Sequence, residues 1–248
     1  MHEELLGAAQ LLAQSGHPAA FTGAGVSAES GIPTYRDSEG LWQQYRVEDV
    51  ATPEGFQRDP RKVWEFYNER RKQLWGIEPN AAHYALAELE SVFPEFVVMT
   101  QNVDRLHQKA GSRNVIELHG NLCEVRCVDC GATFDKTGEE LAPLPRCERC
   151  SGLLRPAVVW FHEPLPPGAW QAAKHVAESC DCLLVVGTSA QVYPAAALVD
   201  IAQAGGAKII EINLEPSGIT GRTDVSLLGK AGDILPQLVA QCRQQRLR

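Results

Sequence analysis

Short, continuous apolar runs recur along the chain, and stretches with helical periodicity separate most of them. Runs of this kind are typical of strands that are covered on both faces; they span residues 18–22, 96–100, 114–118, 157–161, 182–186 and 208–212. The helical stretches between and around them span residues 1–16, 60–75, 80–91, 169–178, 194–204 and 230–244. Strands and helices in this alternation predict an α/β fold with a parallel, doubly wound sheet.

Two stretches interrupt this alternation. Residues 31–91 hold helices and loops but no good strand, and residues 121–156 are rich in cysteine, glycine and proline. A chain of 248 residues suits one large domain with a small inserted module. We therefore expect a Rossmann-like domain formed by residues 1–30, 92–120 and 157–248. The helical insertion would be residues 31–91, and the small metal-binding module residues 121–156.

The charge and the N-terminal sequence narrow the class of protein. Lys and Arg number 23 against 31 Asp and Glu, a formal net charge of −8, which argues against unspecific nucleic-acid binding. No apolar run reaches the length of a bilayer span, so we expect no membrane partner. The N-terminus carries acids where a secretion signal carries Lys or Arg. We therefore expect a cytoplasmic protein whose eight cysteines serve metal binding or burial rather than disulfides.

Four of the cysteines form two C-x-x-C pairs. Cys127 and Cys130 make the first pair, Cys147 and Cys150 the second, and sixteen residues lie between them. This is the spacing of a two-knuckle zinc site, in which four thiolates complete a tetrahedron and leave no open position for water. We expect one structural zinc ion, since a redox C-x-x-C would be single and lie at a helix start. Cys123 is a minor rival ligand. We expect small buried hydrophobes at the four remaining positions, Cys123, Cys180, Cys182 and Cys242.

A glycine-rich turn follows the first predicted strand. Residues 23–28, Gly-Ala-Gly-Val-Ser-Ala, match the relaxed dinucleotide fingerprint G-x-G-x-x-G/A, in which glycine lets the backbone approach a pyrophosphate. An ordinary dehydrogenase would continue with a second strand that ends in an acid about twenty residues on. Residues 36–40 show no such strand. If a dinucleotide binds here, the site is not the standard hydride-transfer design.

Polar residues cluster directly after four of the predicted strands. Ligands of an open parallel sheet bind beyond the carboxyl ends of its strands; the clusters there are residues 101–104, 119–120, 187–189 and 213–215. Each cluster alone has an ordinary structural explanation, because Asp104 can cap a helix and Asn213 can make a turn. For His119, at a strand end before glycine, we favour a catalytic role over a structural one.

Taken together, these motifs resemble those of the sirtuins. The matching segments stand in the order in which sirtuins carry them: GAGVSAESGIPTYRD at 23–37, QNVDRLH at 101–107, ELHG at 117–120, the paired C-x-x-C, GTS at 187–189 and NLE at 213–215. The resemblance runs from roughly residue 9 to residue 238, and the chain is similar to compact bacterial members. It implies an NAD-dependent protein lysine deacylase that acts on acyl-lysine protein substrates and releases nicotinamide and 2′-O-acyl-ADP-ribose.

The resemblance also implies a role for individual residues. Those that would surround the pyrophosphate, the nicotinamide and its ribose are Gly23, Ala24, Gly25, Ser27, Ile32, Gln101, Asn102 and Asp104, with Arg36 on a loop that closes over NAD. Those that would hold the adenosine half are Gly187, Thr188, Ser189, Asn213, Leu214, Glu215 and Ala231. Asn102 would also serve catalysis, and His119 would be the general base. A neutral imidazole suits this task because its pKa lies near physiological pH.

Two segments, residues 51–56 and 64–71, resemble the sirtuin branch that removes succinyl and malonyl groups. Tyr67 and Arg70 stand at i and i+3 and so share one helix face. An arginine fork matches a carboxylate, a phenol can donate to the same group, and Ala51 would leave room for a longer acyl chain. The alternative is that Tyr67 belongs to the core and Arg70 to a solvated face. Arg71 and Lys72 are the expected control positions because they point elsewhere.

The segment that would pair with the substrate peptide contains one departure from the family pattern. Val159 and Phe161 fit that pattern, but His162 stands where the family usually has glycine, so loop geometry or peptide pairing could be altered. Val103 in place of the commoner isoleucine is a mild change. The enzymatic alternative to deacylation is mono-ADP-ribosyl transfer from the same NAD site. A non-catalytic, zinc-bearing module that senses NAD is disfavoured, because the expected base and the nicotinamide-side residues are all present.

Overall fold

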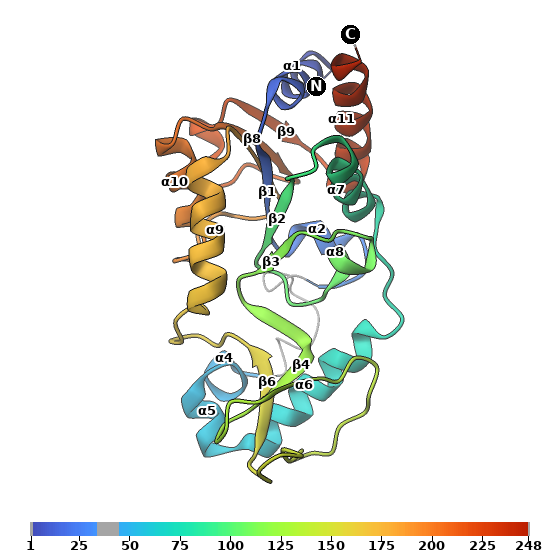
Figure 1. The fold of residues 1–248 in the computed structure, drawn as a ribbon. Helices are drawn as coiled ribbons and strands as arrows, with labels where there is room; N and C mark the ends of the chain where they lie inside the picture. Colours follow the sequence, from blue (N-terminus) through green and yellow to red (C-terminus); the bar gives the residue numbers. More distant parts are fainter. Residues whose placement is uncertain (1, 34–44, 248) are drawn as a thin grey trace.

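The computed structural model describes residues 2–33 and 45–247, and Arg36 lies outside these ranges. Its larger body is built on a six-stranded parallel sheet in the order β3-β2-β1-β7-β8-β9 (Figure 1). The strands are β1 (Pro18–Thr22), β2 (Val97–Thr100), β3 (Val115–Glu117), β7 (Cys182–Val186), β8 (Lys208–Asn213) and β9 (Val225–Leu228). The predicted α/β class with a doubly wound parallel sheet is confirmed.

Helices cover both faces of this sheet. Successive residues of a strand point to opposite sides, and the strands are mostly apolar, so both faces carry apolar side chains that must be buried. One face packs against α1 (His2–Gln14), α7 (Ala81–Val92) and α11 (Ala231–Arg246). The other packs against α9 (Pro167–Ser179) and α10 (Ala197–Ala204). In Figure 1 these two layers lie on either side of the strands. Asn80 is the N-cap of α7: its side chain accepts a hydrogen bond from the Ala82 N–H at 2.9 Å.

A smaller body holds a three-stranded antiparallel sheet in the order β5-β4-β6. Its strands are β4 (Gly120–Cys127), β5 (Thr133–Asp135) and β6 (Leu154–Val158). They share one apolar core with helices that come much earlier in the sequence, α4 (Val47–Val50), α5 (Pro53–Arg58) and α6 (Pro60–Leu74). The helical segment and the cysteine-rich segment therefore stabilise each other at the lower end of the molecule in Figure 1.

The predicted strand at 157–161 is wrong as a member of the parallel sheet. Only residues 157 and 158 are in a strand, and that strand is β6 of the smaller sheet. The rest of the run crosses between the two bodies. The Val159 N–H donates to the His119 carbonyl at 2.9 Å, and the Phe161 N–H donates to the Ala51 carbonyl at 3.0 Å. The sixth parallel strand is β9 instead, a four-residue edge strand that the apolar-run criterion missed.

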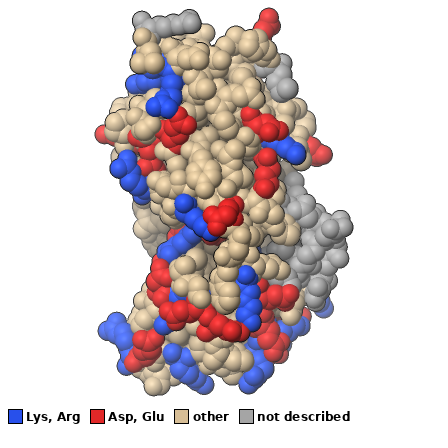
Figure 2. Space-filling view, turned by 90° about the vertical axis from the view of Figure 1, so that its right-hand side faces the viewer, with Lys and Arg blue, Asp and Glu red and all other residues tan. Residues whose placement is uncertain are grey.

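Three short elements complete the described structure: α2 (Gly25–Ala28), α8 (Leu106–Lys109) and the 3₁₀ turn η1 (Thr220–Arg222). Within the described residues, no helix combines the length and the apolar character needed to cross a membrane. On the face drawn in Figure 2, basic and acidic side chains are intermixed, most densely over the smaller body. That face therefore presents no continuous basic track of the kind that nucleic-acid backbones require.

Candidate active site

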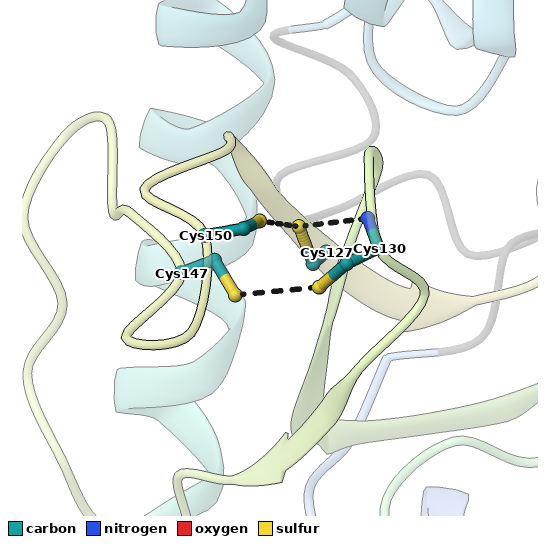
Figure 3. A group of neighbouring side chains, drawn as sticks. All are labelled: Cys127, Cys130, Cys147 and Cys150. Carbon is teal, nitrogen blue, oxygen red and sulfur yellow. Dashed lines mark hydrogen bonds between the residues drawn. The ribbon is translucent and has the colours of Figure 1, made fainter.

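The four cysteines of the paired motifs converge on one point of the smaller body (Figure 3). Their sulfur atoms all lie within 4.8 Å of one another. Cys127 Sγ is 3.5 Å from Cys150 Sγ, and Cys130 Sγ is 3.7 Å from Cys147 Sγ. Sulfur atoms that hold zinc tetrahedrally with bonds of about 2.3 Å lie about 3.8 Å apart. The donor set and its spacing therefore fit one structural zinc ion with closed coordination.

The remaining cysteines lie outside this cluster. Cys180, Cys182 and Cys242 are buried, as the sequence predicts, and Cys123 is half-buried. Burial raises the pKa of Cys180 and of Cys242 to about 11 and raises that of Cys182 as well. These three thiols are therefore neutral at physiological pH and behave as apolar core groups.

The glycine turn after β1 meets the turn after β7 at the carboxyl edge of the parallel sheet. The Gly25 N–H donates to the Gly187 carbonyl at 2.8 Å. A Cβ atom at Gly25 would stand 2.8 Å from Gly187 Cα, closer than side-chain carbons come to their neighbours. Only glycine allows the two turns this close approach. The glycine turn and the third polar cluster of the sequence thus form one continuous edge.

Ser27 is the centre of a buried polar network on this edge. Its hydroxyl accepts a hydrogen bond from Asn102 Nδ2 at 3.0 Å and donates to Asp104 Oδ2 at 2.8 Å. Asn102 Nδ2 also donates to the Gly23 carbonyl at 3.1 Å. Burial raises the pKa of the Asp104 carboxyl, whereas hydrogen bonds from Ser27 and from the Leu106 N–H lower it. The network holds three residues of the predicted nicotinamide side in one fixed arrangement.

His119 follows β3, and a backbone carbonyl of the same sheet edge orients its ring. Its Nδ1 lies 2.9 Å from the carbonyl oxygen of Gln101. Because a carbonyl only accepts, Nδ1 carries the proton and Nε2 keeps its lone pair. Burial lowers the pKa of His119 from its usual 6.5, although the bond to Gln101 raises it somewhat. His119 is therefore a neutral imidazole with a basic Nε2 at physiological pH, which is the form a general base requires.

Two buried histidines lie behind Ser27, and sequence analysis assigned them no role. The Asn80 N–H donates to His83 Nδ1, which leaves His83 Nε2–H to donate to the Ser27 hydroxyl at 3.3 Å. His107 Nε2 lies 2.9 Å from the Thr22 hydroxyl. Burial lowers the pKa of His83 to about 4 and that of His107 to about 3, so both rings are neutral. In the sequence, His83 stands in the predicted helix at 80–91 and His107 ends the segment QNVDRLH; neither position by itself indicates burial.

The predicted adenosine-side residues lie at the ends of β7 and β8. Asn213 Nδ2 donates to the Thr188 carbonyl at 3.1 Å, and Gln101 Nε2 donates to the Thr188 hydroxyl at 2.9 Å. Leu214 is 67% exposed, and Glu215 is exposed beside it. Ala231 is buried at the start of α11. The first, third and fourth polar clusters of the sequence are thus adjacent.

The two residues predicted for the acyl carboxylate differ in their surroundings. Tyr67 is only 2% exposed and belongs to the core of the smaller body, where its hydroxyl accepts a hydrogen bond from Trp160 Nε1 at 2.9 Å. Burial raises the pKa of Tyr67, so the phenol stays protonated. Arg70 is half-buried with its guanidinium carbon 5.7 Å from the centre of the Phe66 ring. Burial lowers the pKa of Arg70, and the nearby Asp104 raises it.

A cavity of about 480 Å³ opens between the two bodies. Its polar wall combines predicted cofactor residues with the predicted acyl-site cation: Ala24, Ser27, Arg70, Gln101, Asn102 and Asp104. Its apolar wall includes Ile32, Leu74, Ile77 and Leu122. The other described residues predicted for the site do not line it: Gly23, Gly25, Ala51, Tyr67, His119, Val159, Phe161 and the adenosine-side residues. The cavity is thus large enough for a ligand, and the Arg70 guanidinium, the Asn102 carboxamide and the Asp104 carboxylate all line it.

His162 adopts the backbone conformation that favours glycine, with φ at 70°. The expected change in loop geometry is therefore not required, because the histidine accepts the left-handed conformation. Its exposed side chain lies 3.8 Å from the Glu54 carboxylate. Phe161 beside it is 48% exposed, while Ala51, which accepts its N–H, is buried.

A glycine-rich edge of a parallel sheet, a neutral histidine and a four-thiol site define a dinucleotide-binding α/β protein with a structural metal module. The model of the Sir2 family matches residues 23–194, and the chain belongs to the Sir2 family. It is 53% identical over 239 residues to NAD-dependent protein deacylase 2 of Pyrobaculum aerophilum, covering 96% of this chain and 95% of that protein.

Two solved structures extend the comparison. The chain resembles a crystal structure of a Sir2 homologue–NAD complex with a TM-score of 0.92 and 47% identity, covering 99% of this chain and 95% of the other. It also resembles a Sir2Af2 structure bound to a myristoylated histone peptide, with a TM-score of 0.80 and 42% identity, covering 100% and 99% of the two chains.

Proposed function

We propose that this protein is an NAD-dependent protein lysine deacylase that removes succinyl, malonyl and acetyl groups, with nicotinamide and 2′-O-acyl-ADP-ribose as products. The proposed acyl preference rests on one observation: Arg70 is half-buried and lines the same cavity as Asn102 and Asp104. The deacylase activity itself is supported by the names of the family relatives and by the conjunction of the glycine edge with His119. The similarity to compact bacterial members stays a prediction.

The residues of the carboxyl edge have distinct tasks in this proposal. The glycine turn lets the backbone approach the pyrophosphate, and the Ser27 network orients Asn102 and Asp104 toward the nicotinamide ribose. NAD supplies the electrophilic ribose carbon and the hydroxyl that receives the acyl group. His119 takes a proton from that hydroxyl at Nε2, while the Gln101 carbonyl holds the ring in the required tautomer.

Zinc has a structural task only. Four thiolates complete its coordination and leave no position for water or substrate, so no chemical step requires the metal. The residues that would hold it are Cys127, Cys130, Cys147 and Cys150. The core of the smaller body includes Cys127 and Cys147, so the metal would stabilise the wall that carries Arg70.

Succinyl- and malonyl-lysine differ from acetyl-lysine by a terminal carboxylate. Burying that carboxylate in the cavity is costly unless a cation meets it. Arg70 supplies the cation, and Tyr67 keeps its own phenolic proton to donate, because its oxygen is the acceptor in the bond from Trp160. Ala51 and Tyr67 do not line this cavity, so their contact with the acyl group stays a prediction from the resemblance. Val159 and Phe161 would flank the substrate peptide.

Mono-ADP-ribosyl transfer would use the same NAD site and break the same bond, but the names of the relatives favour deacylation. Product mass distinguishes the two reactions. Acetyl-, succinyl- and malonyl-lysine peptides are incubated with and without NAD and analysed by mass spectrometry. We expect NAD-dependent loss of each acyl group. A peptide that gains ADP-ribose supports the transferase, and loss of acetyl alone contradicts the proposed acyl preference.

A further inference from the structure

Glu211 is a fully buried acid in the middle of β8. Its strand neighbours are Val185 on β7 and Ser226 on β9. A buried carboxylate is strongly unfavourable unless it is paired or fully hydrogen-bonded. Within the described part of the chain, no Lys, Arg or His forms an ion pair with it. Its partners must therefore be neutral donors.

Three hydroxyl groups donate to this carboxylate. Ser217 donates to Oε1, while Thr220 and Ser226 donate to Oε2 at 2.7 and 2.8 Å. Two of these hydroxyls also accept backbone N–H groups of the segment that follows β8. The Ser217 N–H donates to the Thr220 hydroxyl at 2.8 Å, and the Ile219 N–H donates to the Ser217 hydroxyl at 3.3 Å. The carboxylate is thus the centre around which residues 214–226 are folded.

The segment held in this way carries the adenosine side of the carboxyl edge. It leaves β8 at Asn213, which is tied to the Thr188 carbonyl and accepts the Gly229 N–H at 2.8 Å. It then exposes Leu214 and Glu215. A Cβ atom at Gly218 would stand 3.6 Å from the Ser189 carbonyl, so the segment also packs against the turn after β7.

We infer that Glu211 is a positioning residue for NAD, which acts through the segment 214–226 to fix the adenosine half of the cofactor site. The inference rests on the proposed function, because NAD must be the ligand of this edge. Glu211 itself lies beneath the surface and would touch no cofactor atom. A carboxylate suits the task since it accepts at both oxygens, whereas a glutamine amide would present donors to one of the three hydroxyls.

Loss of this anchor should weaken binding by lowering the population of the competent loop. If only a tenth of the molecules keep the loop in place, the apparent Kd rises about tenfold. We therefore expect E211A to raise the Kd for ADP-ribose about tenfold or more, and E211Q and T220V to raise it less. The KM for NAD should rise in parallel. We expect kcat at saturating NAD and the KM for the acyl peptide to stay within about twofold of wild type.

Glu90 provides a control, because it is also a buried acid whose carboxylate accepts the backbone N–H groups of Arg113 and Asn114; in addition it pairs with the Arg113 guanidinium. It lies on α7, away from the segment 214–226. E90Q should lower the melting temperature without changing the Kd for ADP-ribose. A purely structural role of Glu211 would give that same pattern. The comparison of the two variants therefore separates positioning from general stability.

The experiment is isothermal titration of wild-type and variant protein with ADP-ribose, with NAD kinetics and melting temperatures measured alongside. A selective rise in Kd and in the KM for NAD supports the inference. Unchanged ADP-ribose affinity in both E211Q and T220V overturns it, whatever their stability. If E211A fails to fold, these two milder variants decide the matter. Wild-type protein that binds no ADP-ribose contradicts the proposed function itself, so the two failures are distinguishable.

Discussion

At the scale of single residues, one backbone carbonyl determines the acid–base chemistry of His119. The Gln101 carbonyl fixes the proton on Nδ1, and burial lowers the pKa of the imidazole below 6.5. Acid inactivation requires protonation of Nε2, so we expect the acid limb of kcat/KM to lie below pH 6.5. The measurement is the pH profile of kcat/KM with an acetyl-lysine peptide. H119A should lose about 10²–10⁴-fold in rate on every acyl type. An acid limb above pH 6.5, or near-normal turnover of H119A, contradicts the assignment.

Arg70 should decide between charged and neutral acyl groups. A hydrogen bond to a charged group contributes about 1.5–3 kcal/mol, roughly 10–150-fold in catalytic efficiency. We expect R70M to lower kcat/KM for a succinyl peptide by about that factor while it retains most of the activity on the acetyl form. Y67F should have the same direction and a smaller effect, since it removes only a hydroxyl. The measurement compares both acyl forms of one peptide at one saturating NAD concentration.

Lys72 is the right control for this comparison, and Arg71 is not. Lys72 is exposed and pairs with Glu140 on the surface. Arg71 is 4% exposed and donates to the Leu122 carbonyl, so its replacement would disturb the wall of the cavity. K72M should change neither activity. If R70M lowered both activities equally, Arg70 would be holding the fold or NAD rather than an acyl carboxylate.

The zinc ligands could be predicted from the sequence, whereas the buried charged residues could not. The paired cysteines could be placed because thiolate spacing is a local property that a tetrahedral ion constrains. Glu211 and Arg71 could not be placed, because an isolated acid in an apolar run and an arginine on a polar helix give no local sign of burial. Their partners lie from 6 to 68 positions away in the sequence. Only the fold brings those partners together.

At the scale of elements, α6 is fastened to the smaller sheet by Arg71. Its guanidinium donates to the carbonyls of Leu122, Lys136 and Glu139. We expect R71M to destabilise the protein by about 1.5–3 kcal/mol, because bonds from a charged donor are lost and the carbonyls stay buried. That corresponds to a fall of about 3–12 °C in melting temperature for a chain of this size. The measurement is thermal unfolding of R71M beside K72M. Equal melting temperatures of the two variants would contradict the proposed role of Arg71.

Two elements show why apolar runs alone did not define the sheet. The run at 157–161 is apolar because it crosses between two cores, and Val158 and Trp160 are buried there although Phe161 is 48% exposed. Strand β9 is short and lies at the sheet edge, and its last residue, Leu228, is 42% exposed. Periodicity records burial and not the sheet to which a segment belongs. The remaining five strands were predicted because both of their faces are covered by helices.

At the scale of the whole molecule, the larger and the smaller body meet at the carboxyl edge of the parallel sheet. The chain passes from His119 directly into β4 of the smaller body and returns at Val159, which bonds to the His119 carbonyl. Arg105 bridges the two bodies, since it pairs with Glu117 beside β3's end and with Asp135 on β5. The geometry around His119 therefore depends on the integrity of the smaller body.

This dependence predicts how the molecule responds to loss of zinc. Structural zinc contributes roughly 10–16 kcal/mol in small peptides, and the core of the smaller body includes Cys127 and Cys147. We expect a chelator to unfold the smaller body first and to abolish deacylation, while the six-stranded sheet keeps its structure. Hydrogen exchange should then rise in β4, β5, β6 and α6 and stay slow in β1, β7 and β8.

Affinity for ADP-ribose provides the second measurement, because the adenosine-side residues all belong to the larger body. We expect the chelated protein to bind ADP-ribose with an affinity within about tenfold of the native value. A tenfold loss is what would follow if the segment 214–226 kept its binding-competent conformation in only one molecule in ten. Zinc added back should restore both activity and protection, and C147S should reproduce the chelated state. Uniform exchange across both bodies would contradict this division, because it would mean that the two cores unfold as one cooperative unit.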